Sequence, residues 1–125
     1  MKILVINGHP DKESYCQAIF QTIVETIDSN RHELQVISLN EEDFDPVLRY
    51  GYRKRMEEDS FILRSQEWIQ WADHLIFVYP IWWSSMPSLM KGWIDRVFTP
   101  GIAYSANDQG SFIWNYLRGK QFKKL

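Results

Sequence analysis

Hydrophobic residues in this chain follow two patterns, short continuous runs and longer repeats on one helical face. The two patterns alternate along the sequence. Three short runs are almost continuously apolar, which is typical of strands buried on both faces of a sheet: residues 2–7, 34–39 and 74–79. Three longer stretches carry apolar residues on one helical face: residues 14–27, 59–72 and 87–98. The order strand, helix, strand, helix, strand, helix predicts βαβ units, a parallel sheet and an α/β fold.

Local signals refine the three predicted helices. Isoleucines recur every fourth residue in the first helix, at Ile19, Ile23 and Ile27. Asp59 or Ser60 can cap the second helix, and Pro87 suits the first turn of the third. These signals predict amphipathic helices that pack one face against the sheet.

Three other features of the sequence favour structural explanations over chemical ones. Gly92 lies inside the third predicted helix, where glycine costs about 1 kcal/mol relative to alanine, so we expect a packing reason for it. Asp95 and Arg96 are expected to be solvated or paired. Residues 53–60 change from basic to acidic, which is typical of an exposed face, and we assign them no function.

Composition narrows the class of protein. A chain of 125 residues with a formal net charge of −2 fits one domain over residues 1–125, with no broad attraction to nucleic acid or anionic membranes. The first apolar run has four residues and the longest has nine with a proline inside, too short for a secretory signal or a membrane span. Cys16 is the only cysteine, which excludes an internal disulfide and suits a reducing compartment. We therefore expect a cytoplasmic protein.

The segment that follows the first predicted strand has the features of an anion site. Ligands of open parallel sheets bind beyond the carboxyl ends of the strands, and "NGHPDKESY" lies there. Ser14 and the backbone N–H groups of Tyr15 and Cys16 begin the first helix, an end that favours phosphate, and His9 adds a donor. The spacing fits equally well with Ser14 as an ordinary helix cap and His9 as a surface residue.

The segment that follows the third predicted strand, "YPIWWSSMP", carries two adjacent tryptophans to the same end of the sheet. Trp82 and Trp83 can pack into the core below a loop or form a wall for a flat ring. The following Ser84 and Ser85 indicate a short loop, in which two large rings remain partly exposed. The pattern favours a ligand wall over core packing.

Proteins of this architecture have other activities as well, and the chain lacks the residues that these activities require. A dinucleotide fold needs G-x-G-x-x-G after the first strand, and the chain has only Gly8 there. A low-molecular-weight phosphatase needs an arginine six residues after its cysteine, and Thr22 follows Cys16 at that distance. A response regulator has an aspartate at the end of the third strand, where this chain has Tyr79. Metal-ligand spacing is absent among the histidines His9, His32 and His74.

Taken together, these segments resemble the flavodoxin-like NAD(P)H dehydrogenase (quinone) family. Its members include NAD(P)H:quinone oxidoreductases, modulator-of-drug-activity-B proteins and ancillary reductases of potassium efflux systems. The resemblance lies in "GHPDKESYCQAI", the long "ADHLIFVYPIWWSSMPSLMKGWIDRVF" and "PGIAY". It implies a doubly wound parallel sheet of strand order 2-1-3, with a stub of a fourth strand at residues 120–125. The family's further C-terminal strands, and its Thr-Thr-Gly-Gly flavin loop, are expected to be absent from this chain.

The resemblance also implies a flavin site. The residues that correspond to the family's phosphate contacts are His9, Ser14, Tyr15 and Cys16. Those that correspond to its ring contacts are Pro80, Ile81, Trp82, Trp83 and Ser84, and Tyr104 corresponds to an aromatic residue near the quinone pocket. The implied cofactor is FAD, with FMN as the alternative, and no catalytic side chain or metal is expected because the flavin carries the chemistry.

The activity implied by the resemblance is hydride transfer from NAD(P)H through the flavin to a quinone or similar acceptor, in a homodimer. The alternative, suggested by the early end of the chain, is a non-catalytic remnant or a regulatory partner, associated peripherally with a transporter. The acceptor, and the choice between NADH and NADPH, stay open.

Overall fold

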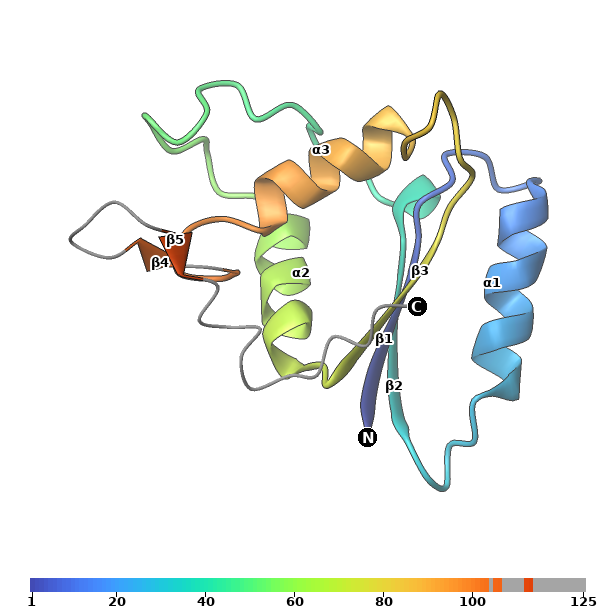
Figure 1. Cartoon of the computed structure of the whole chain (residues 1–125). Helices are drawn as coiled ribbons and strands as arrows, with labels where there is room; N and C mark the ends of the chain where they lie inside the picture. The colour runs from blue at the N-terminus through green and yellow to red at the C-terminus, as the bar shows by residue number, and fades with distance from the viewer. Residues whose placement is uncertain (104, 107–111, 114–125) are drawn as a thin grey trace.

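A computed structural model of the chain describes residues 1–103, 105–106 and 112–113 (Figure 1). Its central feature is a parallel sheet of order β2–β1–β3, formed by β1 (Lys2–Asn7), β2 (Glu33–Ser38) and β3 (His74–Val78). The predicted strand order 2-1-3 is confirmed. The predicted stub at residues 120–125 lies outside the described residues, and the assignment of one domain to the whole chain stays a prediction.

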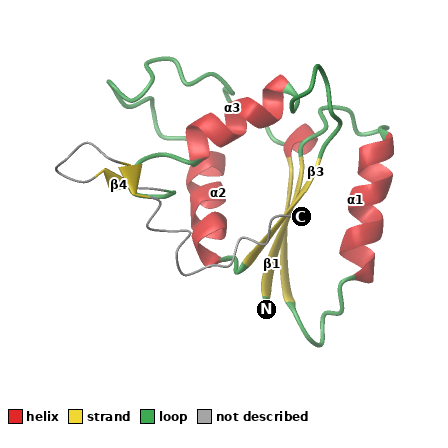
Figure 2. Ribbon diagram, in the orientation of Figure 1, coloured by secondary structure: helices red, strands yellow, loops and turns green. Residues whose placement is uncertain are grey.

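Helices cover both faces of this sheet (Figure 1). Helix α1 (Tyr15–Thr26) lies on one face, and α2 (Ser60–Trp71) and α3 (Ser88–Val97) lie on the other. A short 3-10 helix, η1 (Leu39–Glu41), follows β2, and a small antiparallel pair, β4 (Ser105–Ala106) and β5 (Phe112–Ile113), stands apart from the sheet (Figure 2). Within the described residues, no helix has the length and apolar character needed to cross a membrane. The arrangement is the three-layer α/β fold that the sequence predicts.

Alternating side chains of β1 supply a core on each face of the sheet. Leu4 and Ile6 are fully buried in the cluster beneath α2 and α3. Ile3 and Val5 belong to the second cluster, beneath α1, which Phe20 completes. Because β1 is central, both of its faces exclude water, which explains its uninterrupted apolar sequence.

The predicted helix ends are correct within a residue or two, with two differences of detail. Pro87 is the N-cap of α3 and not part of its first turn. In α1, the buried residue is Phe20, whereas Ile19 of the predicted isoleucine stripe is exposed. The helix is therefore rotated slightly from the orientation that the four-residue repeat suggested.

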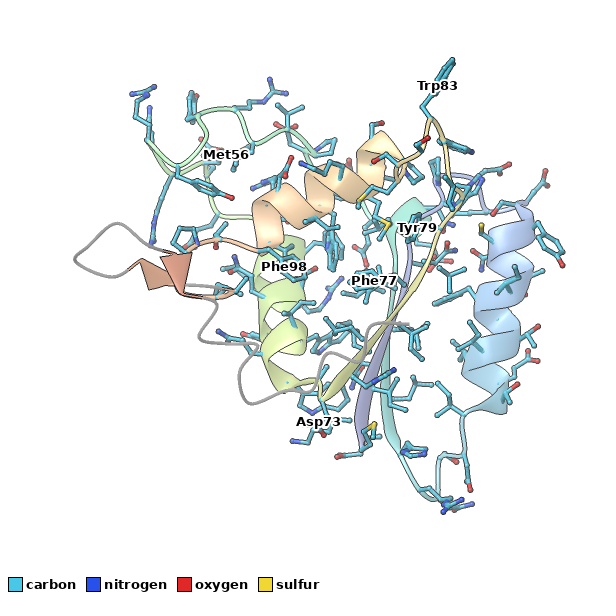
Figure 3. All side chains as sticks on the ribbon, viewed as in Figure 1. Met56, Asp73, Phe77, Tyr79, Trp83 and Phe98 are labelled. Atoms are coloured by element: carbon cyan, nitrogen blue, oxygen red, sulfur yellow. The ribbon has the colours of Figure 1, made fainter. Side chains whose placement is uncertain are left out.

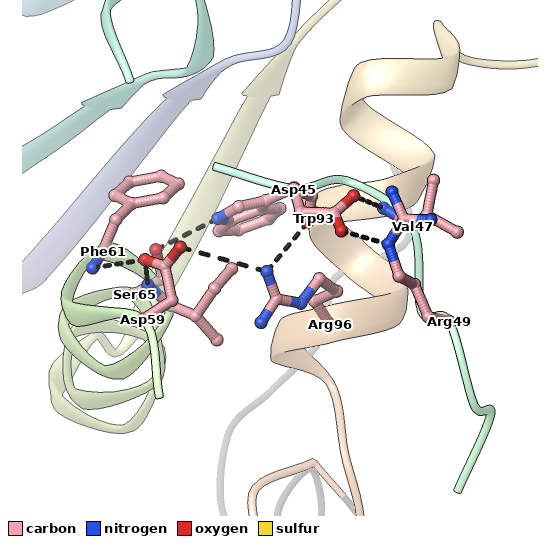
Figure 4. Close-up of polar contacts among 9 residues, drawn as sticks. Asp45, Val47, Arg49, Asp59, Phe61, Ser65, Trp93 and Arg96 are labelled. Carbon is pink, nitrogen blue, oxygen red and sulfur yellow. Dashed lines mark hydrogen bonds and ion pairs between the residues drawn. The ribbon is translucent and has the colours of Figure 1, made fainter. Parts of the chain in front are cut away.

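Buried polar groups hold α2, α3 and the preceding loop together (Figure 4). The indole N–H of Trp93 donates to Ser65 Oγ at 3.0 Å. Arg96 is buried, its Nη1 donates to the carbonyl oxygen of Asp45 at 2.8 Å, and the same atom lies 4.0 Å from Asp59 Oδ2. Of the two alternatives expected for Arg96, solvated or paired, the paired one is confirmed. A hydrogen bond from the Arg49 guanidinium lowers the pKa of Asp45 below its ordinary value.

Asp59 is the N-cap of α2, and its removal is expected to destabilise the fold. Its Oδ1 accepts from the N–H groups of Phe61 and Ile62 at 2.9 and 3.2 Å. Asp59→Ala leaves both donors without this partner and should lower the free energy of unfolding by about 1 kcal/mol. Urea denaturation measures the loss, with Ser60→Ala as the neighbouring control. Equal midpoints for the two variants would contradict the assignment of the cap to Asp59.

Candidate functional site

Two loops singled out in the sequence, residues 7–15 (the first loop) and residues 79–87 (the tryptophan loop), meet at the carboxyl end of the sheet. The N–H of Gly8, just after β1, donates to the carbonyl oxygen of Val78, the last residue of β3, at 2.8 Å. Beyond this contact, the rings of His9 and Trp82 meet edge to face, with centroids 5.3 Å apart and an interplanar angle of 80°. The neighbouring strands β1 and β3 thus bring together the first loop and the tryptophan loop, as predicted.

The first loop presents hydrogen-bond donors at the start of α1. Ser14 caps the helix, since its Oγ accepts from the N–H of Gln17 at 3.2 Å, and its own hydroxyl hydrogen remains available to donate. The N–H groups of Tyr15 and Cys16 belong to the first turn, which has no acceptors within its own helix. The Cys16 side chain packs against the core beneath α1, so Cys16 offers a ligand its backbone N–H and not its thiol. The cap and anion-site readings of Ser14 are therefore compatible.

His9 is oriented by its own loop. Its Nδ1 accepts from the backbone N–H of Asp11 at 2.9 Å. A neutral imidazole with an accepting Nδ1 carries its hydrogen on Nε2. The Nε2–H is then the donor that His9 offers to a ligand.

The tryptophan loop closes in a tight turn that projects Trp83 away from the protein. Trp82 and Ser85 exchange two backbone hydrogen bonds, of 2.9 and 3.1 Å. Between them, Trp83 and Ser84 have φ angles of 51° and 60°, which makes this a type I′ turn without glycine. Trp83 is 101% exposed and points outward beyond the end of the sheet (Figure 3).

The neighbours of Trp83 add apolar surface beside it. We call the exposed surface of residues 80–84 the crest. Ile81 is 75% exposed and Trp82 44%, while Pro80 is half-buried. Trp83 therefore does not belong to the core, and Trp82 is only partly covered, on the side of His9. A flat ring can lie against this surface without displacing any packed side chain.

Sequence reasoning missed a polar cluster directly behind the first loop. Its members come from the ends of β1 and β2, from α1 and from η1: Asn7, Gln17, Ser38 and Asn40. One signal in the sequence pointed to it, the amide residue Asn7 at the inner end of the apolar run "KILVIN". A buried amide requires partners, and those partners come from distant segments.

A separate hollow of about 490 Å³ lies away from the strand ends. It opens between residues 48–59, α2 and residues 99–102, and none of the predicted flavin contacts lines it. Its lining includes the buried Arg96, whose guanidinium already donates a hydrogen bond to the carbonyl oxygen of Asp45. We therefore place the candidate site at the crest of the two loops and not in this hollow.

Two further predictions concern Tyr104 and a metal site. Tyr104, predicted near the quinone pocket, lies outside the described residues. Among the described residues, no group of three or more His, Cys, Asp or Glu side chains is arranged to hold a metal ion.

The fold and the crest together define an α/β protein with a candidate ligand site at the carboxyl end of a parallel sheet. A family model described as a flavodoxin-like fold matches residues 1–123, and the chain belongs to that family. The sequence-based assignment to flavodoxin-like NAD(P)H dehydrogenases (quinone) is confirmed by the names of its relatives.

One curated relative is a "Ribosyldihydronicotinamide dehydrogenase-like protein" of Penicillium crustosum, 30% identical over 133 residues that cover 91% of this chain and 50% of that protein. Among solved structures, Smu.1420 from Streptococcus mutans is 35% identical with a TM-score of 0.77, covering 90% of this chain and 60% of that one. The NAD(P)H:quinone oxidoreductase from Methanothermobacter marburgensis is 28% identical with a TM-score of 0.71, covering 84% and 57%. The chain spans about half the length of these curated relatives.

Proposed function

We propose that this chain binds a flavin across the two loops and acts as an NAD(P)H-dependent quinone oxidoreductase. The observation that carries the proposal is the contact between His9, in the loop that leads into α1, and Trp82, which flanks a strained, exposed turn after β3. The named activities of its relatives supply the reaction class.

In this proposal the first loop holds the phosphate end of the cofactor. Ser14 Oγ, the N–H groups of Tyr15 and Cys16, and Nε2–H of His9 are the donors. The positive end of the α1 dipole adds to their attraction for an anion. Both FAD and FMN carry phosphate, and FAD is the cofactor we propose, with FMN as the alternative.

The tryptophan turn holds the ring in this proposal. The wall consists of Pro80, Ile81, Trp82, Trp83 and Ser84. Within the described residues, the N–H groups of Trp83 and Ser84 have no acceptor, so they are free to donate to a polar edge of the ring. When bound, the flavin supplies reversible hydride acceptance, and the chain contributes binding, orientation and hydrogen bonds.

A homodimer is also part of the proposal, and the exposed crest supports it; the cytoplasm is the location that we propose. Ile81 and Trp83 leave apolar surface open to water at one end of the molecule, where a second copy of the chain can cover it. Light scattering of the purified chain measures this directly. A strictly monomeric mass, with and without flavin, would remove the dimer from the proposal.

The proposed function is tested by binding and turnover in the same preparation. Titration of the purified chain with FAD and with FMN, followed by flavin fluorescence, should show saturable binding. Oxidation of NADPH by menadione should then depend on both the chain and the added flavin. Binding without turnover would favour the non-catalytic alternative, and the absence of binding to either flavin would refute the proposal.

A further inference from the structure

Asn7 is buried completely at the end of β1, and both polar atoms of its side chain are engaged. Its Nδ2 donates to Gln17 Oε1 at 2.7 Å and to Ser38 Oγ at 3.4 Å. Its Oδ1 accepts from the backbone N–H of His9 at 3.1 Å. The side chain therefore ties the first loop to the sheet and to α1 at once.

Asn40, in η1, holds the other backbone polar group of His9, its carbonyl oxygen. Its Nδ2 donates to the carbonyl oxygen of His9 at 3.2 Å and to Gln17 Oε1 at 3.1 Å. Its Oδ1 accepts from the Ser38 hydroxyl at 3.0 Å. Both backbone polar groups of His9 are thus held by asparagine side chains, and Gln17 Oε1 is the acceptor that the two asparagines share.

We infer that Asn7 and Asn40 are positioning residues for phosphate recognition, acting through the backbone of His9. This inference rests on the proposed function, because it concerns the loop that holds the flavin phosphate there. Neither asparagine is assigned a contact with the ligand. They fix the loop before the ligand arrives, so that binding does not have to order it.

The geometry explains why such fixation matters at this point. His9 follows Gly8, which is anchored to β3, and its ring meets Trp82 of the turn. Donors at a helix N-terminus hold an anion well only when they stay within about 0.5 Å of their productive positions. A first loop released from Asn40 would let the His9 ring and its Nε2–H drift from both the phosphate and the indole.

Asn40→Ala is the sharpest test, because Asn40 is only partly buried and its loss should leave the fold intact. The probes are FMN and riboflavin, which share one ring system and differ in the phosphate. Loss of the hydrogen bonds at His9 is expected to weaken FMN binding by about tenfold, while riboflavin binding stays unchanged. Gln17→Met removes the shared acceptor without adding charge and should shift the same ratio in the same direction.

Ser65→Ala separates positioning from general stability. Ser65 is fully buried and accepts a hydrogen bond from Trp93 on the opposite face of the sheet, away from the two loops. Its loss should lower the Tm, yet the ratio of FMN to riboflavin affinity should equal that of the wild type.

The outcomes of the binding series decide two points, the positioning role and the proposed function. An unchanged ratio in both Asn40→Ala and Gln17→Met, with wild-type preference for FMN intact, would overturn the positioning role alone. Equal loss of FMN and riboflavin affinity would overturn it too, since the network would then act on the whole fold. A wild-type chain that binds neither probe would refute the proposed function itself.

Discussion

Replacing Gly92 with alanine is expected to lower the free energy of unfolding by about 2–3 kcal/mol, although alanine is the better helix former. A Cβ atom at this position would lie 2.1 Å from the carbonyl oxygen of Pro46 and 2.6 Å from its Cβ. Both neighbours are parts of a rigid residue, so neither can move aside as a flexible side chain would. The clash therefore outweighs the roughly 1 kcal/mol that alanine gains in helix propensity.

Chemical denaturation in urea measures this difference, and Lys91→Ala is the matched control. Lys91 is the preceding residue of the same helix and is exposed, with an ion pair to Asp95 on the helix surface. Its replacement should change the stability by at most about 0.5 kcal/mol. If Gly92→Ala were as stable as the wild type, residues 42–46 would not pack against α3 in the way described.

The strands could be predicted from the sequence because their burial is simple. The predicted run at residues 2–7 is β1 itself, since a central strand is apolar on both faces. The other two runs match β2 and β3 to within one residue. Periodicity reports burial, and in a three-layer fold burial follows directly from the position of each strand.

The location of the candidate site was also predictable, because topology alone places it. Once β1 and β3 are neighbours in a parallel sheet, the loops that follow them share one edge. The His9–Trp82 contact is a consequence of that arrangement. The form of the tryptophan turn was not predictable, since a type I′ turn is normally signalled by Asn-Gly and this chain has Trp83 and Ser84 there.

Contacts between distant residues escaped the sequence analysis for a different reason. Arg96 meets the carbonyl oxygen of Asp45 across a separation of 51 residues. The segment that carries Asp45 has neither strand nor helix periodicity, so its place against α3 leaves no trace in the pattern. The same holds for Asn40, whose partners His9 and Gln17 come from the first loop and α1. Local pattern predicts elements, and long-range polar pairing has to be read from the fold.

Replacing Trp83 with glycine is expected to change stability and flavin affinity in opposite directions. Residues other than glycine pay roughly 1–2 kcal/mol for a left-handed conformation such as the φ of 51° at Trp83. The indole is fully exposed, so it gains no packing energy that would offset this strain. Trp83→Gly should therefore raise the free energy of unfolding by up to about 1 kcal/mol, once the greater backbone freedom of glycine in the unfolded state is included.

The same substitution should weaken flavin binding by about 1–3 kcal/mol if the indole stacks on the ring as aromatic side chains stack on nucleobases. Trp83→Ala removes the indole while keeping a side chain in the strained turn, so it should lose similar affinity without the gain in stability. Tyr50→Ala removes another exposed aromatic ring, outside the two loops, and should leave flavin affinity unchanged. Urea denaturation and FAD titration of the same preparations measure both quantities. A Trp83→Gly variant that binds FAD as tightly as the wild type would remove the turn from the flavin site, and one that is less stable would show that the indole contributes to the fold.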